Sequence, residues 1–150
     1  MYDCREQTYM EYIPHFNIIS MYVYIMLYPI IISSIVMLVL DIAYLSTFGK
    51  PFVDQTVMIQ KSPFELNYIG AMASYLCMII GLNYFVISKQ GSLQDAFVLG
   101  FVMYGVYDAT NMALLKKWLP DLALMDTLWG ATLMTVTTFL TYQSINLLNL

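Results

Sequence analysis

Three aspartates stand inside long apolar runs of the sequence: Asp41, Asp108 and Asp126. A carboxylate in such surroundings needs a proton, a bound cation, water or a basic partner, because an isolated charge is costly in a medium of low dielectric constant. The runs themselves contain no Lys or Arg apart from Lys116 at the very end of the third, and the other lysines stand in the segments that flank them. Two kinds of chemistry fit this pattern: hydrogen bonding between helices, and the binding of a proton or a cation.

Other polar and aromatic residues accompany the aspartates. Tyr104, Asp108 and Asn111 are spaced i, i+4, i+7, which places them on one stripe of a helix, and Tyr107 flanks that stripe. We therefore expect one buried polar cluster that is neutral or cation-occupied near neutral pH, or that serves as hydrogen-bonding contacts between helices. The predicted cluster consists of Asp41, Asn67, Tyr104, Tyr107, Asp108, Asn111, Asp126 and Trp129.

Four apolar runs must position these side chains, and each is long enough to cross about 30 Å of hydrocarbon as a helix of roughly 20 residues. The predicted spans are residues 22–46, 64–87, 94–116 and 121–142. Residues 1–17 are predicted to be a polar tail, and residues 18–150 a transmembrane domain. The expected fold is all-α, an integral membrane four-helix bundle in a multi-pass protein.

The ends of the predicted helices carry signals of their own. The stretch Ser62-Pro63-Phe64-Glu65 is typical of a helix start, Ser92 to Asp95 is a weaker example, and Pro120 can begin the last helix. Pro29 stands inside the first run, so that helix either kinks or starts late. We favour a span from near Pro29, preceded by a segment at the membrane interface.

Composition excludes several classes of protein. The chain of 150 residues is 60% hydrophobic and 11% charged, too few charges for a water-soluble monomer. Its formal net charge of −4 argues against nucleic-acid binding. Two cysteines make neither a disulfide framework nor a metal cluster, and no metal or cofactor motif is present. The lipid bilayer is the expected environment, and no cofactor is expected.

Charge and small residues predict the topology and packing of the helices. The first and third loops carry four Lys against two Lys or Arg elsewhere, so these loops are expected on the cytoplasmic or equivalent side, with both termini opposite. Alternating helix direction then places the aspartates in one leaflet. Small residues that allow close helix contact are Gly70, Gly105, Ala109, Ala113 and Gly130. These favour the third helix as the central one, with Leu99 facing lipid.

Three segments together resemble a known family. They are Tyr104-Gly105-Val106-Tyr107-Asp108-Ala109-Thr110-Asn111, Asp126-Thr127-Leu128-Trp129-Gly130 and Leu40-Asp41-Ile42-Ala43-Tyr44-Leu45. The chain resembles, from about residue 26 onward, the small membrane proteins grouped as domain of unknown function 2177, although that family commonly has Trp where this chain has Tyr44. The resemblance implies a four-helix integral membrane protein and no established activity.

Three classes of function fit these features. A structural or accessory membrane protein is the first, with a homo-oligomer or another membrane protein as its partner. The second is a small proton- or cation-coupled transporter or channel, which would act as a homo-oligomer because four helices leave little room for a pore. The third is a lipid-modifying enzyme, which we disfavour because the single histidine, His15, stands in the polar tail and no nucleophile is evident.

Overall fold

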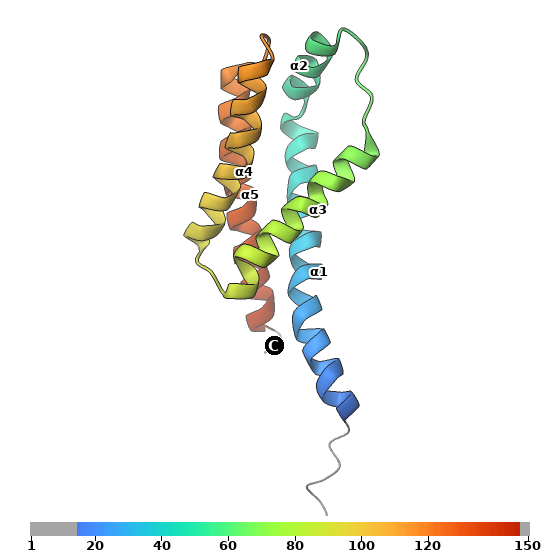
Figure 1. Cartoon of the computed structure of the whole chain (residues 1–150), viewed down its shortest axis with the longest axis vertical. Helices are drawn as coiled ribbons and strands as arrows, with labels where there is room; N and C mark the ends of the chain where they lie inside the picture. Colours follow the sequence, from blue (N-terminus) through green and yellow to red (C-terminus); the bar gives the residue numbers. More distant parts are fainter. Residues whose placement is uncertain (1–14, 148–150) are drawn as a thin grey trace, which may run out of the picture.

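The structure, a computed structural model, describes the backbone of residues 15–147 and the side chains of residues 27–147. Four long helices and two short ones account for most of this part of the chain, and no strand occurs in it. The helices are α1 (His15–Phe48), α2 (Lys50–Gln60), α3 (Tyr68–Phe85), η1 (Ile87–Lys89), α4 (Leu93–Leu114) and α5 (Pro120–Leu147). The predicted all-α fold of four long helices is confirmed (Figure 1).

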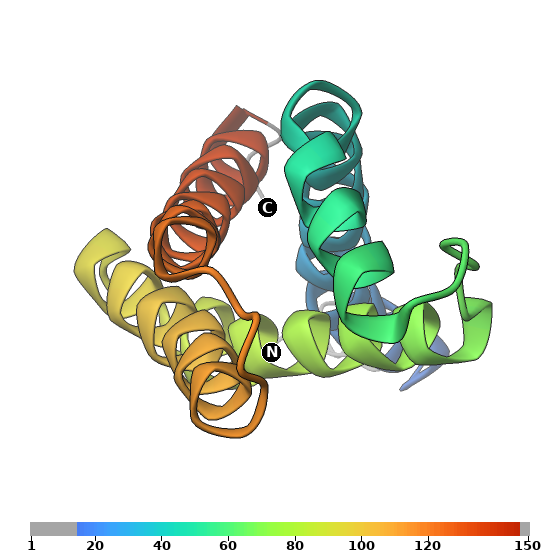
Figure 2. The same ribbon diagram turned by 90° about the horizontal axis from the view of Figure 1, so that it is seen from above.

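The long helices alternate in direction along the chain. The short helix α2 and the loop between α4 and α5 lie at one end of the molecule, opposite the described start of α1 and end of α5 (Figure 1). Figure 2 shows α4 and α5 side by side, with α1 and α3 completing the arrangement. A buried glutamine fixes the α2 end, because Gln55 Oε1 accepts the backbone N–H of Leu119 at 2.7 Å.

Three of the helices are long and apolar enough to cross a membrane: the segments are Leu27–Phe48, Tyr68–Lys89 and Leu93–Leu114. The helix α5 has 28 residues, long enough for a span, but it is not among these apolar segments. Four threonines of α5 are buried in the bundle and so do not face lipid. Because these side chains need not be apolar, α5 is less hydrophobic than the other long helices. A fourth crossing by α5 stays a prediction.

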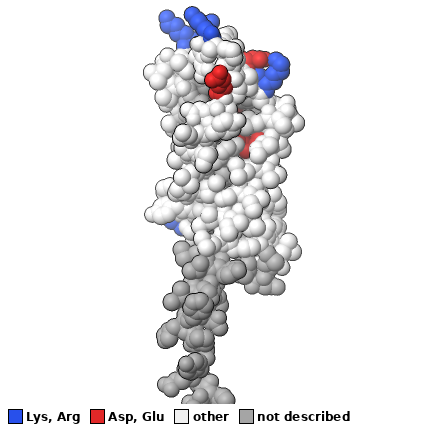
Figure 3. All heavy atoms as spheres, turned by 90° about the vertical axis from the view of Figure 1, so that its right-hand side faces the viewer, with Lys and Arg blue, Asp and Glu red and all other residues white. Residues whose placement is uncertain are grey.

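Lysine side chains of the described residues gather at the end of the molecule where α2 lies, and the surface toward the other end is mostly uncharged (Figure 3). Lysines at both ends of α2 and in the loop between α4 and α5 contribute to this end: Lys50, Lys61, Lys116 and Lys117. The uncharged surface carries exposed Leu, Ile, Val and Phe side chains from every long helix. Such a surface suits contact with lipid chains, as expected for a membrane protein.

The predicted start of the second span needs correction, whereas the third begins within one residue of the predicted place. The helix α3 begins at Tyr68 rather than at residue 64, because Asn67 is its N-cap and accepts the N–H of Gly70 at 3.0 Å. The preceding helix α2, which we did not expect, ends at Gln60 and is followed by Lys61 in a left-handed conformation. Ser92, predicted as the weaker signal, forms a complete capping box.

Two predictions concern the remaining helix starts. The predicted start of the last helix at Pro120 is confirmed. The first helix does not start late, because α1 continues from His15 through Pro29, whereas its apolar span Leu27–Phe48 begins near the predicted place. An interfacial segment before that span stays a prediction. Of the predicted polar tail, residues 15–17 belong to α1, and residues 1–14 lie outside the described part of the chain.

The central helix is α5, not α4 as the small residues of the third span had suggested. In α5 nine residues are buried, compared with three in α4. The helix α5 also packs against both α4 and α1. The closest contact joins two glycines, because a Cβ on Gly100 would overlap the backbone of Gly130. A Cβ on Gly130 would in turn overlap the ring of Tyr104. Gly130, predicted as a packing residue, therefore lies at the tightest point of the bundle together with Gly100.

Other predicted packing residues lie elsewhere. A Cβ on Gly105 would sit 3.5 Å from Thr127 Cγ2, an ordinary contact distance, and one on Gly70 would meet only the side chain of Asn67. Ala109 and Ala113 are exposed, so they do not carry the packing of α4 on α5. Leu99, expected to face lipid, is half-buried against the core. The sequence alone does not show which face of α4 meets α5, and this decides the role of each small residue.

The arrangement of the loops predicts a labelling pattern. In a chain whose native cysteines are replaced by serine, Lys50→Cys and Lys116→Cys should react with an impermeant maleimide from the same side of sealed vesicles. Asn146→Cys, near the end of α5, should react only from the other side if α5 crosses the membrane. Labelling of positions 50 and 116 from opposite sides would contradict the fold, and labelling of all three positions from one side would contradict a crossing by α5.

The glycine contacts predict a difference between two matched substitutions in α4. Gly100→Ala should lower the free energy of unfolding by about 1 to 3 kcal/mol, because the added methyl group overlaps the backbone of α5. Gly105→Ala should leave it unchanged or raise it by up to about 1 kcal/mol, because the same group makes one ordinary methyl contact and alanine is the better helix former. Unfolding in detergent measures both; equal effects would mean that α4 and α5 are not in close contact at Gly100.

Candidate functional site

Asp41 of α1 accepts hydrogen bonds from two other helices. Its side chain is buried, and its two oxygens accept the hydroxyl of Tyr75 on α3 at 2.5 Å and the indole N–H of Trp129 on α5 at 2.8 Å. Both carboxylate oxygens thus have a donor, as a buried carboxylate requires. One side chain therefore links α1, α3 and α5.

Aromatic packing holds this junction in place. Tyr44 lies three residues after Asp41, on the same face of α1, and stacks on Trp129 with ring centroids 4.0 Å apart and planes 7° apart. This stack orients the indole whose N–H binds Asp41. The hydroxyl of Tyr44 is itself buried and has no hydrogen-bond partner among the described residues.

Asp108 of α4 forms a second junction. It is 3% exposed and accepts the hydroxyl of Thr127 on α5 at 3.3 Å and the indole N–H of Trp118 at 3.1 Å. Trp118 belongs to the loop between α4 and α5, and its ring packs edge-on against Tyr107 at 5.9 Å. Asp108 therefore ties α4 to α5 and to the loop that joins them.

Asp126 of α5 lies between these two junctions. It is half-buried, within electrostatic range of both Asp41 and Asp108, and no described residue donates a hydrogen bond to it. Tyr104 of α4 is close enough to Asp41 and Asp126 for a carboxylate charge on either to act on its hydroxyl group. That hydroxyl donates a hydrogen bond to the sulfur of Met78 at 3.2 Å. The three aspartates with their partners thus form one region to which every long helix contributes.

We call this region the acidic layer, defined by the three aspartates and the side chains that contact them or lie in electrostatic range of them. Its members are Asp41, Tyr44, Tyr75, Tyr104, Tyr107, Asp108, Trp118, Asp126, Thr127 and Trp129. Within the described part of the chain, no three His, Cys, Asp or Glu side chains lie close enough together to hold a metal ion. The hydrogen bonds and buried carboxyl groups of the layer suit interhelical hydrogen bonding and proton binding.

Two residues predicted for the cluster lie at its margin or outside it. Asn67 is exposed and caps α3, so its amide oxygen is used by its own helix. Asn111 is half-buried beside the more exposed Tyr107. Neither amide is hydrogen-bonded to an aspartate in the described structure.

Four members of the acidic layer were not among the residues predicted for the cluster: Tyr44, Tyr75, Trp118 and Thr127. Tyr75 stands in the middle of an apolar helix, where a phenolic hydroxyl needs a partner. Thr127 follows Asp126 directly and faces α4. Trp118 stands beside two lysines, a position that favours an interface anchor. A search for hydrogen-bond donors within the apolar runs, in addition to charged groups, would have found Tyr75 and Thr127.

A family profile described as "Predicted membrane protein (DUF2177)" matches residues 18–143. The chain belongs to this family. The resemblance predicted from the three sequence segments is confirmed, and the matched region of this DUF2177 protein contains all three aspartates of the acidic layer. No curated protein and no solved structure matches the chain. Family membership and three candidate membrane-spanning helices together identify an integral membrane protein.

The two hydrogen bonds of Asp108 predict different effects for two substitutions. Asp108→Asn should leave the melting temperature in detergent nearly unchanged, because the amide oxygen can accept from Trp118 while the amide nitrogen donates to the hydroxyl of Thr127. Asp108→Leu should destabilise the protein by about 1 to 3 kcal/mol, because it leaves the buried hydroxyl of Thr127 and the half-buried indole N–H of Trp118 without an acceptor. A large loss in the Asn variant would show that the negative charge, and not the hydrogen bonds, is what the fold requires.

Proposed function

We propose that this DUF2177 protein is a structural or accessory membrane protein and not an enzyme. The observation that carries the proposal is the pair of hydrogen bonds at Asp41, which join α1 to both α3 and α5. Asp108 joins α4 to α5 in the same way. The acidic layer then serves to hold the four long helices in one arrangement, and the assembled bundle presents its apolar surface to lipid and to a membrane partner, which is a second copy or another protein.

The donors at the aspartates support a non-enzymatic role. Asp41 and Asp108 each accept two hydrogen bonds from side chains of other elements, so both carboxylates already have a role in holding the helices together. The donors to them are a phenol, two indoles and a threonine hydroxyl. Among the side chains that the structure describes, no histidine accompanies these groups. A lipid-modifying enzyme would need an activated nucleophile or a positioned base at this point.

A second candidate function is proton- or cation-coupled transport by a homo-oligomer. Two observations favour it: Asp126 has no hydrogen-bond partner among the described residues, and buried threonines continue along α5 toward the other end of the bundle. The buried threonines are Thr127, Thr137, Thr138 and Thr141. Two of them, Thr138 and Thr141, donate to carbonyls of their own helix, which is the ordinary role of a buried threonine in a membrane helix.

A flux measurement distinguishes the two candidates. The purified protein is reconstituted into liposomes loaded with a pH-sensitive dye, and the decay of an imposed proton gradient is followed with K⁺, Na⁺ or neither present. The structural or accessory role predicts decay at the rate of protein-free liposomes. Flux that is abolished by Asp126→Asn and kept by Asp121→Asn, an exposed aspartate on the same helix, would establish transport and contradict the proposal.

The accessory and non-enzymatic parts have tests of their own. Gentle solubilisation of the native membrane followed by native mass spectrometry should show a partner, either a second copy or another membrane protein, in fixed stoichiometry. Lipid profiles of cells with and without the gene should be the same. A protein that is monomeric and has no partner would contradict the accessory role. A lipid species that accumulates when the gene is deleted would contradict the non-enzymatic role.

A further inference from the structure

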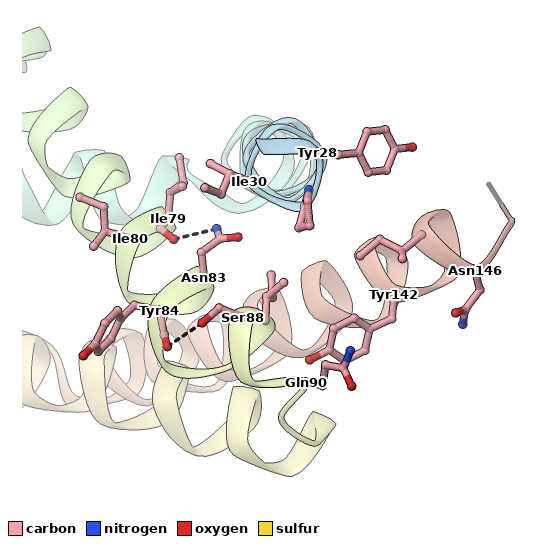
Figure 4. Close-up of a pocket in the computed structure, with 13 residues that line it drawn as sticks. Tyr28, Ile30, Ile79, Ile80, Asn83, Tyr84, Ser88, Gln90, Tyr142 and Asn146 are labelled. Carbon is pink, nitrogen blue, oxygen red and sulfur yellow. Dashed lines mark hydrogen bonds between the residues drawn. The ribbon is translucent and has the colours of Figure 1, made fainter. Parts of the chain in front are cut away.

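A pocket of about 980 Å³ opens at the end of the bundle opposite α2, away from the acidic layer. It lies between α1, the segment from α3 through η1, and α5 (Figure 4). Its volume is at the upper end of the range for small-molecule sites in proteins. Isoleucines supply much of its wall: Ile30, Ile79, Ile80, Ile87 and Ile145. The pocket is therefore suited to an apolar chain.

A buried amide in the wall of this pocket lacks one hydrogen bond. The side chain of Asn83 is 8% exposed, and its nitrogen donates to Ser33 Oγ and to the carbonyl of Ile79, both at 2.9 Å. The carbonyl of Ile79 can only accept, so the nitrogen must face it and the oxygen must point the other way. Figure 4 shows that oxygen directed away from α3, toward the space between α1 and α5.

The oxygen of Asn83 has no donor among the described residues. A buried carbonyl without a partner costs about 1 to 3 kcal/mol, and hydrocarbon offers no water to supply the missing hydrogen bond. Tyr142, which also lines the pocket, does not supply it, because its hydroxyl donates to the carbonyl of Gly91 at 2.9 Å. The pocket thus combines an apolar wall with one acceptor that needs a donor.

The charge of the lining indicates what kind of headgroup fits. None of the residues that line the pocket is charged, and Ser88, Gln90 and Asn146 are its other polar side chains apart from tyrosines. The neighbouring cation, Lys89, lies over the rings of Tyr84 and Phe85, at 5.2 and 5.5 Å from their centroids. A charged headgroup would have no oppositely charged side chain in the pocket wall, whereas hydroxyl and amide groups would find polar partners.

We propose that this pocket binds one neutral amphiphilic lipid, with its chain along the isoleucine wall and a hydroxyl or amide N–H donated to Asn83 Oδ1. Glycerol monoesters, fatty alcohols and fatty amides share this chemistry. The donor completes the hydrogen bonding of the buried amide, and the rest of the headgroup lies against Ser88, Gln90 and Asn146. The site is separate from the acidic layer, so the proposal of a lipid site does not depend on the proposed function.

Photolabelling of the purified full chain in detergent micelles tests the proposal. The probes are three lipids that carry the same diazirine oleoyl chain: monooleoylglycerol, methyl oleate, which has no donor, and phosphatidylglycerol, which is anionic. Monooleoylglycerol should label peptides of the pocket wall at up to one lipid per chain. Methyl oleate should label them about fivefold more weakly at the same concentration, a difference that one uncharged hydrogen bond accounts for.

Three variants locate the site. Ile145→Trp fills the pocket without touching the partners of Asn83 and should reduce labelling at least fivefold. Asn83→Leu removes the acceptor and should abolish the difference between monooleoylglycerol and methyl oleate. Ile69→Trp adds the same bulk on the exposed surface of α3, where the side chain is 81% exposed, and should leave labelling unchanged.

Several results would overturn the proposal. One is labelling that is spread evenly over exposed helix faces or unaffected by Ile145→Trp. Another is equal labelling by monooleoylglycerol and methyl oleate in the unmodified chain, which would remove the role of Asn83. Stronger labelling of the pocket by phosphatidylglycerol would show that the site takes an anionic lipid. If Asn83→Leu fails to fold, the comparison of the two neutral probes still decides the role of the amide.

Discussion

A polar group buried in hydrocarbon must find its hydrogen-bond partner within the protein, and the structure depends on how Asp41 meets this constraint. Its two oxygens take one donor from α3 and one from α5, so the side chain can be accommodated only when three helices are in place. Asp108 of α4 meets the same constraint by accepting a hydrogen bond from Thr127 of α5. A residue that is costly in a single helix thereby specifies how the helices pack.

The same constraint explains why α5 differs in composition from the other long helices. A helix that other helices cover on several faces gains little from apolar side chains there, because it exchanges few contacts with lipid. Buried threonines and the glycine contact with α4 instead allow close approach, and the threonine hydroxyls of the last turns donate to carbonyls of α5 itself. The least apolar of the four long helices is therefore the one that organises the bundle.

Much of the fold could be predicted from the sequence, because hydropathy and helix caps are local signals. Four long helices, the start of α5 at Pro120 and the family resemblance all followed from residues close together in the chain. The contacts of the acidic layer could not be predicted in the same way. Which residue of the second span reaches Asp41 depends on where α3 begins and on how it crosses α1, and the residue that does so is Tyr75, about two turns after Asn67. Small residues gave a similar ambiguity, since Gly105 and Gly100 differ only in the face of α4 that they occupy.

The central claim is that interhelical hydrogen bonds to aspartate hold this membrane protein together, and a double-mutant cycle at Asp41 tests it most directly. Unfolding free energies in detergent would be measured for the unmodified chain, Tyr75→Phe, Asp41→Ala and the double variant. Because Tyr75→Phe removes only the hydroxyl that donates to Asp41, the account predicts a coupling energy of about 0.5 to 1.7 kcal/mol between the two positions. A coupling energy indistinguishable from zero would contradict it.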